Sequence, residues 1–376
     1  MSNLPLRPDI EGDQPYGAPE LDVPVRLNVN ENPYAPAPGV VADIAQAAAQ
    51  AAVGLNRYPD RDFATLRQAL ADYLAVESGV RVPAEQIWAA NGSNEVMLHL
   101  LQAFGGPGRV CLSFTPTYSM YPEYARDTLT EYRTRARRED FTLDVDAAVS
   151  AIHEARPAVV ILASPNNPTG TALPLEHVQA VLDATRRNGP TTSNGSPTDA
   201  VVVVDEAYGE FRRPGVPSAL ELLDNNPNLA VSRTMSKAFG MAGLRLGYLA
   251  AARELVDALR VVRLPYHLSA LTQAAALAAL GHRQELMSQV ASLRAERDAL
   301  VDWLRTQGYT AFDSDANFVL FGPFQDRDAV WQALLDRGVL IRVVGPDGYL
   351  RVSVGTPAEI QQFRDALTAI NKEEQP

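Results

Sequence analysis

The chain has 376 residues, which is room for about two domains of ordinary size. Its formal net charge of −12 argues against a general nucleic-acid binder or a protein that binds anionic membranes. The one cysteine, Cys111, excludes an intrachain disulfide and a multi-cysteine zinc site, and its apolar neighbours predict a buried thiol. The sequence shows no transmembrane stretch and no apolar signal-peptide core, so we expect a soluble cytoplasmic protein.

Short apolar runs alternate with helical patterns through most of the chain. A polar arm, residues 1–36, comes first, and helices are expected next at 40–53 and 63–77. Strands are expected at 86–90, 109–114, 158–163, 200–205, 229–233 and 246–251, with helices at 93–104, 145–154 and 175–187. This alternation predicts an α/β fold with a mainly parallel sheet covered by helices, in a large domain of residues 37–262.

The pattern changes after residue 251. Helices are expected at 254–262, 270–280, 285–307, 327–337 and 357–370, and strands at 317–321, 339–343 and 349–354. Residues 263–376 are therefore predicted to form linking helices and a small α+β C-terminal domain. Residues 188–199, rich in Gly, Pro, Ser and Thr, are predicted to form an exposed, mobile loop.

Lysine is unusually rare in this chain. Of the 33 basic residues other than histidine, only Lys237 and Lys372 are lysines. Lys372 lies in the polar tail 371–376, which we expect to fray. Any chemistry that needs a lysine amine must therefore use Lys237.

Asp205 and Lys237 each follow a predicted buried strand. Asp205 ends a run of valines and begins the sequence Asp-Glu-Ala-Tyr, and Lys237 lies within Ser-Lys-Ala-Phe-Gly. In open α/β sheets, ligands bind outside the carboxyl ends of the strands. Asp205 is therefore a candidate ligand-binding acid, although a strand-end cap explains it as well. The small and apolar neighbours of Lys237 favour a lowered pKa and Schiff-base chemistry, although a surface lysine would fit the same turn.

Two further turns follow predicted strands. Residues 164–170, Ser-Pro-Asn-Asn-Pro-Thr-Gly, form a turn in which an Asn side chain can donate to a ligand oxygen. Residues 90–95, Ala-Asn-Gly-Ser-Asn-Glu, join a strand to a helix whose first N–H groups suit a phosphate. Either turn alone is explained by an ordinary loop or helix cap. With Asp205 and Lys237 they form a specific constellation.

Together these motifs resemble the fold type I aminotransferases, which depend on pyridoxal 5′-phosphate. The likeness runs from about residue 27 to about residue 355, in the family's order, and includes Ala-Gly-Leu-Arg-Leu-Gly-Tyr at residues 242–248. It implies an α/β fold with a mainly parallel central sheet flanked by helices, and a small α+β C-terminal domain. It also implies a homodimer.

The resemblance assigns the cofactor contacts residue by residue. Lys237 would hold the cofactor covalently and then carry a proton between the substrate's α-carbon and C4′. Asp205 would pair with the pyridinium nitrogen, so that Lys237, Asp205 and Tyr208 are the expected catalytic residues. Tyr208 and Asn167 would bind the 3′-oxygen, and Tyr118 would stack on the ring.

The phosphate of the cofactor would be bound at the strand ends and at a helix N-terminus. The residues implied are Ser93, Asn94, Thr234, Ser236 and Arg245. Tyr58 matches a tyrosine that in this family reaches the phosphate bound by the partner subunit, so the site would be shared across the homodimer. Asn94 stands where many members carry an acid, but the contact there uses main-chain N–H, so we expect binding to survive.

Within this family the chain is most similar to the histidinol-phosphate aminotransferases, actinobacterial members in particular. The likeness rests on residues 27–34 (Leu-Asn-Val-Asn-Glu-Asn-Pro-Tyr), 56–60 (Asn-Arg-Tyr-Pro-Asp), 263–269 (Arg-Leu-Pro-Tyr-His-Leu-Ser) and 315–321 (Asp-Ala-Asn-Phe-Val-Leu-Phe). The implied reaction is transamination of L-histidinol phosphate with 2-oxoglutarate to imidazole-acetol phosphate and L-glutamate, in histidine biosynthesis.

Arg351 matches the family arginine that binds the substrate carboxylate. In the other half-reaction the same guanidinium would bind the phosphate of histidinol phosphate. Arg342 would assist, and Tyr16, Asn30 and Tyr266 would complete the substrate pocket. A surface arginine on a strand is the other explanation for Arg351 and Arg342.

The five histidines do not indicate a metal site. His267 is interpreted as a structural residue rather than a catalytic one. The others have no ligand spacing between them, and they are His99, His153, His177 and His282. We therefore predict no bound metal.

Three other functions stay open on the sequence. An aromatic-amino-acid aminotransferase on the same scaffold would share every cofactor residue, so Tyr16, Asn94, Tyr266 and the phosphate-binding arginine must discriminate. A decarboxylase acting on a phosphorylated amino acid would not need 2-oxoglutarate. A transcription regulator with an aminotransferase-like domain would need an added DNA-binding domain, for which we expect no room because the motifs begin near residue 16.

Overall fold

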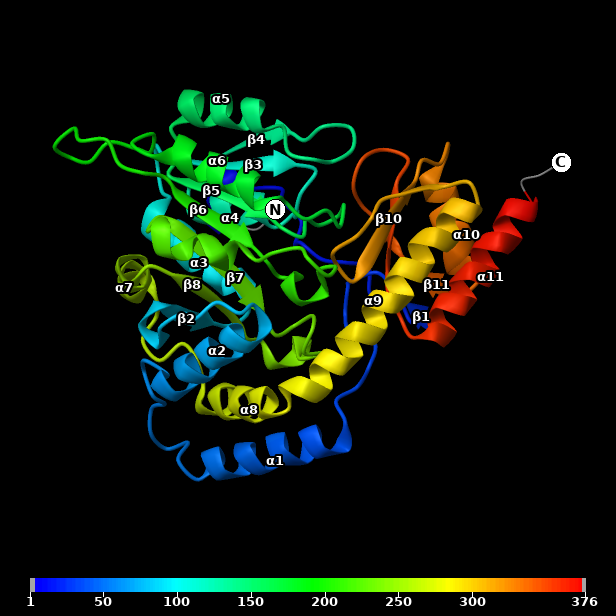
Figure 1. The fold of residues 1–376 in the computed structure, drawn as a ribbon, viewed down its shortest axis with the longest axis horizontal. Coiled ribbons are helices and arrows are strands. Elements are labelled where there is room, and N and C mark those ends of the chain that lie inside the picture. The colour runs from blue at the N-terminus through cyan, green and yellow to red at the C-terminus, as the bar shows by residue number, and fades with distance from the viewer. Residues whose placement is uncertain (1–3, 374–376) are drawn as a thin grey trace.

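A computed structural model describes residues 4–373, which form a larger hydrophobic core, a smaller one and a third, minor cluster around Tyr208 and Phe318. Helix α9 (Arg283–Thr306) runs from the larger core to the smaller one (Figure 1). Leu286, near its start, packs in the larger core, and Leu300 and Leu304, near its end, pack in the smaller one. The single helix therefore belongs to both cores and joins them.

The larger core is built on a mostly parallel sheet of short apolar strands. The strand order is β2-β8-β7-β6-β5-β3-β4, and β8 runs antiparallel to both of its neighbours. The other pairs are parallel, which confirms the predicted sheet. The strands are β2 (Ile87–Ala90), β3 (Val110–Thr115), β4 (Glu131–Ala136), β5 (Val159–Ala163), β6 (Val201–Asp205), β7 (Leu229–Thr234) and β8 (Gly247–Ala251).

Helices cover this sheet, as predicted. Helix α3 packs beside α7, α5 beside α6, and α1 beside α8. The buried β-branched residues of β6 show why the strands form here, because a run of valines fits a strand that is covered on both faces. The helices are α1 (Pro38–Ala52), α2 (Ala64–Glu77), α3 (Ser93–Phe104), α4 (Tyr121–Asp127), α5 (Val145–Ala155), α6 (Leu175–Thr185), α7 (Arg253–Val262) and α8 (Ala270–Gly281).

The smaller core confirms the predicted α+β domain. An antiparallel sheet has the order β12-β13-β10-β9, and β1 (Val25–Arg26) pairs in parallel with β11 (Val339–Leu340). Helices α10 (Arg327–Asp336) and α11 (Pro357–Glu373) contribute apolar side chains to this core. The antiparallel strands are β9 (Thr310–Ala311), β10 (Phe318–Gly322), β12 (Arg342–Val343) and β13 (Leu350–Ser353).

Side-chain caps fix the first residue of several helices. Asp144, Ser269 and Asp326 precede α5, α8 and α10, and each accepts a hydrogen bond of 2.9–3.1 Å from the backbone N–H three residues later. Such a cap satisfies one of the N–H groups that a helix start leaves unpaired. Short 3-10 helices lie at η1 (Pro8–Ile10), η2 (Ala84–Gln86), η3 (Gly209–Phe211), η4 (Ala219–Asn225) and η5 (Ala242–Leu244).

The two cores do not divide where the sequence pattern changes. Val25 and Leu27, from the predicted arm, pack in the smaller core. Leu268 and Leu280, beyond residue 262, pack in the larger core. We therefore propose a division inside α9, with β1 added to the small domain, in place of the boundaries at 36 and 262.

Three local elements differ from the sequence prediction. Strand β4 is a mostly exposed edge strand with alternating charged residues, so it lacks an apolar run. Helix α4 is short and has a proline in its first turn. The predicted strand 339–343 is broken, because β11 pairs with β1 whereas β12 pairs with β13.

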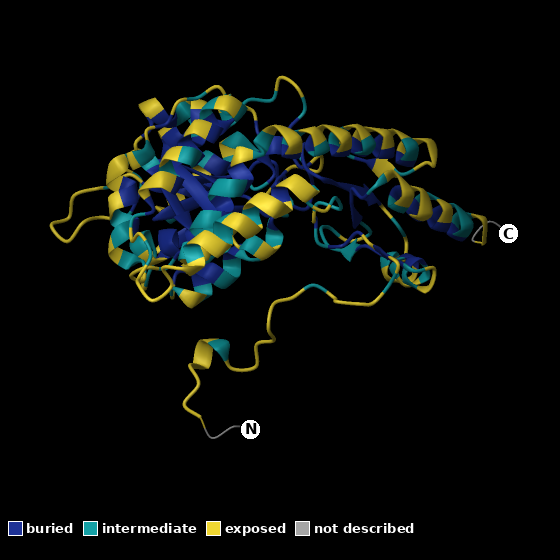
Figure 2. Cartoon of the chain, turned by 90° about the horizontal axis from the view of Figure 1, so that it is seen from below, coloured by how far each residue is buried: buried dark blue, intermediate teal, exposed yellow. Residues whose placement is uncertain are grey.

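The least buried parts of the chain are its N-terminal segment and one loop. Residues 4–24 are mostly exposed and form an extended segment (Figure 2), although Asp13 pairs with Arg126 and Tyr16 contacts Ser119. The loop of residues 188–199 is also largely exposed, as predicted, and a β-bridge joins Thr191 to Pro197. Helix α11 runs on to Glu373, so the predicted frayed tail begins as helix, and 374–376 lie outside the described residues. Within residues 4–373, no helix combines the length and apolarity needed to cross a membrane.

Candidate active site

A cavity of about 320 Å³ opens where β5, β6 and β7 end and α3 begins. Ligands of α/β sheets bind at this edge. Two of its walls come from the extended segment around Asn28–Glu31 and from Arg342 and Arg351 of the small domain. The predicted site residues that line it are Tyr16, Asn30, Ser93, Asn94, Tyr118, Asn167, Asp205, Tyr208, Thr234, Ser236, Lys237, Arg245, Arg342 and Arg351.

Lys237 projects into this cavity from the turn after β7. Its Nζ donates to the carbonyl oxygen of Val29 at 2.9 Å. Burial, with the positive charge of Arg351 and Arg245, lowers the pKa of Lys237 to about 8. The amine is therefore partly neutral near neutral pH and able to act as a nucleophile or a base.

Asp205, the last residue of β6, is buried and surrounded by neutral hydrogen-bond donors. Oδ1 accepts from Ser232 Oγ at 3.0 Å and from the backbone N–H of Ala207 at 3.2 Å, and Oδ2 accepts from the Tyr121 hydroxyl at 2.8 Å. Burial raises the pKa of Asp205 although these donors oppose the shift. No described residue forms an ion pair with this carboxylate, so it suits a cationic ligand atom that enters the cavity.

The first turn of α3 and the turn after β7 make one end of the cavity, which is lined by hydrogen-bond donors and a cation. Gly92, with φ of 84°, precedes Ser93 at the helix start. A Cβ on Gly247 of β8 would lie 2.1 Å from the backbone nitrogen of Ser93, so only glycine lets the strand approach the helix so closely. Ser236, whose hydroxyl is 3.0 Å from that of Thr234, faces the same space. Backbone N–H groups, hydroxyls and the guanidinium of Arg245 together suit a phosphate.

Two polar side chains are oriented by their neighbours within the cavity wall. The Tyr208 hydroxyl accepts from Asn30 Nδ2 at 2.9 Å, which leaves its own proton for a ligand oxygen. The Asn167 amide oxygen accepts from Arg351 Nη1, so its amide nitrogen is left to donate. Both groups are thus set to donate, which is what a negatively charged ring oxygen requires.

Arg351 lies at the opposite end of the cavity, on β13. It is buried over the ring of Phe318, and its Nη2 donates to the backbone oxygen of Asn28 at 2.9 Å. Burial lowers the pKa of Arg351 to about 10, so the guanidinium stays charged at neutral pH. No acidic side chain pairs with it in the described part of the chain, and its Nε has no hydrogen-bond partner there. A buried, uncompensated cation of this kind is a site for an anion.

Two residues border the Arg351 end of the cavity. Arg342 donates weakly to the Gly17 carbonyl at 3.5 Å, and its Nη1 has no hydrogen-bond partner among residues 4–373. Tyr16 is partly exposed, and its hydroxyl lies 2.9 Å from Ser119 Oγ. The N-terminal segment thus closes one side of the substrate end.

Tyr58 and Tyr266 do not line this cavity in their own chain. Their rings stack at a centroid distance of 4.4 Å on the outer surface, where Tyr58 is 80% exposed and Tyr266 38% exposed. The structure therefore keeps these two predicted site residues together but apart from the others.

His267 has the contacts of a structural residue. Its ring stacks on Trp88 at 5.3 Å, and its Nε2 lies 2.9 Å from the carbonyl oxygen of Ala89. Burial lowers its pKa, which favours the neutral ring. Cys111 is also buried, and burial raises the pKa of this thiol to about 12.

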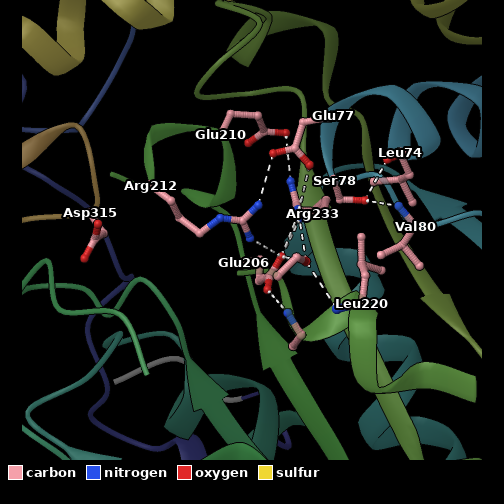
Figure 3. Close-up of polar contacts among 12 residues, drawn as sticks. Leu74, Glu77, Ser78, Val80, Glu206, Glu210, Arg212, Leu220, Arg233 and Asp315 are labelled. Atoms are coloured by element: carbon pink, nitrogen blue, oxygen red, sulfur yellow. Dashed lines mark hydrogen bonds and ion pairs between the residues drawn. The ribbon is translucent and has the colours of Figure 1, made fainter. Parts of the chain in front are cut away.

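A buried charge cluster lies on the other face of β6 and β7. Glu206 and Arg233 each sit next to a residue of the cavity side, so their side chains leave the sheet on the opposite face. Arg233 Nη2 lies 2.7 Å from Glu206 and 3.2 Å from Glu77, and Arg212 pairs with the same two carboxylates (Figure 3). Burial opposes ionisation of Glu206, but the two arginines outweigh it and lower its pKa. The cluster therefore holds the strand ends beneath the cavity.

Sequence reasoning missed Tyr121 and Ser232, the side chains that hold Asp205. Tyr121 follows Tyr118 by three residues and begins α4, but nothing in the sequence shows that it reaches the end of β6. The strand neighbours Asp205 and Ser232 become adjacent through the register of β6 and β7. The pattern of strand-end motifs finds residues that touch a ligand, but not the residues that support them.

The cavity fits the cofactor predicted from the sequence. It contains the buried amine of Lys237, whose pKa is lowered, and the buried carboxylate of Asp205, which has no cationic partner among the described residues. It also contains a group of donors suited to a phosphate, for which the close approach of Gly247 is needed. These groups match the aldehyde, pyridinium nitrogen and phosphate of pyridoxal 5′-phosphate. Among residues 4–373, no group of three or more His, Cys, Asp or Glu side chains is placed to hold a metal ion.

Comparison with known proteins agrees with this geometry. A family model described as aminotransferase class I and II matches residues 23–367. A histidinol-phosphate aminotransferase of Thermobifida fusca is 61% identical, covering 98% of this chain and 95% of that protein. A histidinol-phosphate aminotransferase 3 of Burkholderia lata is 59% identical, covering 98% of this chain and 96% of that protein.

Solved structures share the fold. A histidinol-phosphate aminotransferase of Sinorhizobium meliloti, in complex with pyridoxal-5′-phosphate, superposes with a TM-score of 0.83 at 24% identity over 99% of both chains. An aspartate aminotransferase tetra mutant of Thermus thermophilus superposes with a TM-score of 0.80 at 25% identity, covering 98% of this chain and 99% of that one. The chain belongs to the class I and II aminotransferases.

Proposed function

We propose that the protein is a pyridoxal-phosphate-dependent transaminase of histidine biosynthesis. It converts L-histidinol phosphate and 2-oxoglutarate into imidazole-acetol phosphate and L-glutamate. The observation that carries this is the 51–61% identity, over nearly the whole chain, to curated histidinol-phosphate aminotransferases. The cavity supports it, because one space contains a lysine amine, a carboxylate for a ring nitrogen and an arginine for a substrate anion.

When bound, pyridoxal phosphate supplies the electron sink for charge that develops at the substrate's α-carbon. Lys237 would take the proton from that carbon and deliver it to C4′, for which a pKa near neutral is suited. Asp205 holds the proton on the ring nitrogen, and the hydroxyl of Tyr208 donates to the 3′-oxygen. Ser93, Asn94, Thr234, Ser236 and Arg245 hold the phosphate, and Asn167 and Tyr118 orient the ring.

We propose that the guanidinium of Arg351 binds an anionic group of each substrate. The two half-reactions present different anions, the carboxylate of glutamate and the phosphate of histidinol phosphate. A guanidinium can pair with either, because its fork matches both kinds of oxygen pair. Arg342, Tyr16 and Asn30 border the same end and are proposed to shape it.

The aromatic aminotransferase stays the second candidate, and it is not favoured. The residues that bind the cofactor would be the same in an aromatic aminotransferase and in a histidinol-phosphate aminotransferase, so these residues do not discriminate between the two functions. The curated relatives at 51–61% identity are named for histidinol phosphate. The buried cation Arg351, with Arg342 nearby, also suits the phosphate of that substrate.

The homodimer is part of the proposal and is supported by the surface around Tyr58. Val53, Leu55, Val261 and Leu264 are all more than half exposed and lie in the segments around α1 and α7 that flank the stacked tyrosines. A group of exposed apolar side chains of this kind favours burial against another chain. We propose that Tyr58 reaches the partner's phosphate site and that Tyr266, stacked on it, is positioned with it. The predicted cytoplasmic location stays a prediction.

Product analysis tests the reaction. Purified, cofactor-loaded protein is incubated with L-histidinol phosphate, with and without 2-oxoglutarate, and glutamate and imidazole-acetol phosphate are quantified. We expect equal amounts of both products, and only a single turnover without 2-oxoglutarate. Carbon dioxide release from a phosphorylated amino acid, independent of 2-oxoglutarate, would instead establish the decarboxylase.

A further inference from the structure

The two oxygens of Asp205 are supported unequally. Oδ1 has two donors, the hydroxyl of Ser232 and the backbone N–H of Ala207. Oδ2 has one, the hydroxyl of Tyr121, and this contact of 2.8 Å is the shortest of the three. Loss of the Tyr121 hydroxyl would leave a buried carboxylate oxygen without any protein donor among the described residues.

Tyr121 is part of the cavity wall and is not a surface residue. It is the first residue of α4 and is completely buried, and its side chain borders the cavity. Its ring meets the ring of Tyr118 edge-on at 5.6 Å, so one tyrosine supports the residue expected to stack on the cofactor while its hydroxyl supports Asp205. Burial and the nearby Asp205 charge raise its pKa well above the ordinary value, so the hydroxyl stays a neutral donor.

The physical consequence follows from the surroundings of Asp205. Burial favours the neutral acid, and a neutral acid pairs poorly with a protonated ring nitrogen. Hydrogen bonds to the carboxylate favour the ion. With no cationic side chain paired to Asp205, such donors are the means by which the protein itself can hold the charge.

We propose that Tyr121 is a positioning residue that keeps the Asp205 carboxylate ionised and directed at the ring nitrogen of the cofactor. The proposal rests on the proposed function, since it concerns the same cofactor site. It assigns Tyr121 a role in the electronic state of the cofactor, which a tyrosine that only fills space would not have. Removal of the hydroxyl alone separates the two roles.

The experiment uses full-length protein loaded with pyridoxal phosphate labelled with ¹⁵N in the ring. The ring-nitrogen chemical shift is followed against pH, and the Kd for the cofactor is measured by equilibrium titration of the cofactor-free protein. The test variant is Tyr121→Phe, and Asp205→Ala sets the full effect of losing the carboxylate. The matched control is Tyr248→Phe, since Tyr248 is equally buried but its hydroxyl has no hydrogen-bond partner among residues 4–373.

In Tyr121→Phe we expect the ring nitrogen to lose its proton about one pH unit lower than in wild type, and the cofactor Kd to rise about tenfold, as for one donor removed from a buried charged acceptor. Ser232→Ala should move both quantities the same way but less, because Oδ1 keeps Ala207. Tyr248→Phe should match wild type.

A folded Tyr121→Phe variant whose ring nitrogen titrates as in wild type, with a Kd within about twofold, would overturn the proposal. Should Tyr121→Phe fail to fold, an unchanged ring-nitrogen titration in Ser232→Ala would contradict the same account of the donors. Wild-type protein that binds no pyridoxal phosphate would instead refute the proposed function, so the two failures are distinguishable.

Discussion

Lys237 shows how burial and nearby charge prepare a residue for chemistry. The side chain is enclosed by the cavity, and Arg351 and Arg245 add positive charge around it. Burial most strongly, and these charges next, disfavour the protonated amine, so the pKa falls to about 8 from its ordinary value of 10.5. Since Lys372 lies in the exposed end of α11, the reactive amine of this chain is identified by position as well as by environment.

Covalent uptake of the cofactor should follow the titration of Lys237. Because the neutral amine is the nucleophile, we expect the rate of uptake by cofactor-free protein to rise about tenfold per pH unit below pH 8 and to level off above it. Stopped-flow absorbance between pH 6 and 10 measures this rate. Lys372→Ala should behave as wild type, and Lys237→Ala should bind the cofactor without a bond that borohydride can trap. A rate that levels off only near pH 10 would show that burial does not control this amine.

Arg351 is also shaped by its surroundings, because no acidic side chain pairs with this buried cation among residues 4–373. Replacing it with alanine should weaken both half-reactions by about 2–5 kcal/mol, because each substrate anion loses its bidentate partner. Single-turnover spectra, recorded separately with glutamate and with histidinol phosphate, give kcat/KM for each half. Arg342→Ala, at the rim of the same cavity, should have a smaller effect. If Arg351→Ala changes neither half-reaction, the anchor lies elsewhere and Arg342 is the next candidate.

Among the elements, the ends of β6 and β7 direct some side chains to the cavity and the next ones along the chain to the charge cluster. Asp205 and Ser232 are hydrogen-bonded at the cavity, while Glu206 and Arg233 are paired beneath it (Figure 3). The alternation of a strand makes both arrangements possible from adjacent residues. The cluster therefore helps to fix the positions of the two strand ends that carry the site residues.

Arg233→Met should strongly destabilise the fold. The guanidinium is fully buried, and its loss leaves Glu210 without its cation and Glu206 and Glu77 with Arg212 alone. We expect a loss of about 3–5 kcal/mol in the free energy of unfolding, measured by chemical denaturation of the cofactor-free protein. The control is Arg253→Met, whose ion pair with Asp257 is exposed, with an expected change below about 0.5 kcal/mol. Equal changes in the two variants would mean that the cluster contributes little to stability.

The sequence pattern predicted the strands and helices that contain apolar runs, and it predicted the candidate site residues at the strand ends. The valine run of β6 predicts both a buried strand and the position of Asp205 at its end. Strand β4 and helix α4 escaped because one is an exposed edge and the other is a short helix that begins with Tyr121 and a proline. The contact between Tyr121 and Asp205 joins residues far apart in sequence, so it depends on the complete fold and has no local signal.

At the scale of the whole molecule, the cavity is assembled from both cores. Asp205 and Lys237 lie at or just after strand ends of the larger sheet, and Arg351 and Arg342 lie on strands of the smaller sheet; α9 connects the two cores (Figure 1). Any change in how the two parts meet would therefore move the substrate arginines relative to the cofactor site. In the proposed homodimer, Tyr58 and Tyr266 would add a contribution from a second chain, because they are stacked outside their own cavity.

Mixed dimers test the role of Tyr58. If this side chain serves the partner's phosphate site, Tyr58→Ala and Lys237→Ala should each be weakly active or inactive alone. A heterodimer of the two would have one site with both lesions and one site with neither, so mixing and reassembly should restore part of the wild-type activity. Size-exclusion chromatography with light scattering should give a dimer. Full activity in a demonstrated monomer would refute the shared site.

Histidinol phosphate is the amino donor proposed for this cavity. The most direct measurement is kcat/KM for L-histidinol phosphate and for phenylalanine, each at the same fixed concentration of 2-oxoglutarate. Since the anion end is formed by Arg351 with Arg342 beside it, we predict that histidinol phosphate is used at least about tenfold better, as expected for a site that pairs its charged groups with one substrate more completely than with the other. A higher kcat/KM for phenylalanine would contradict the account and make the protein an aromatic aminotransferase.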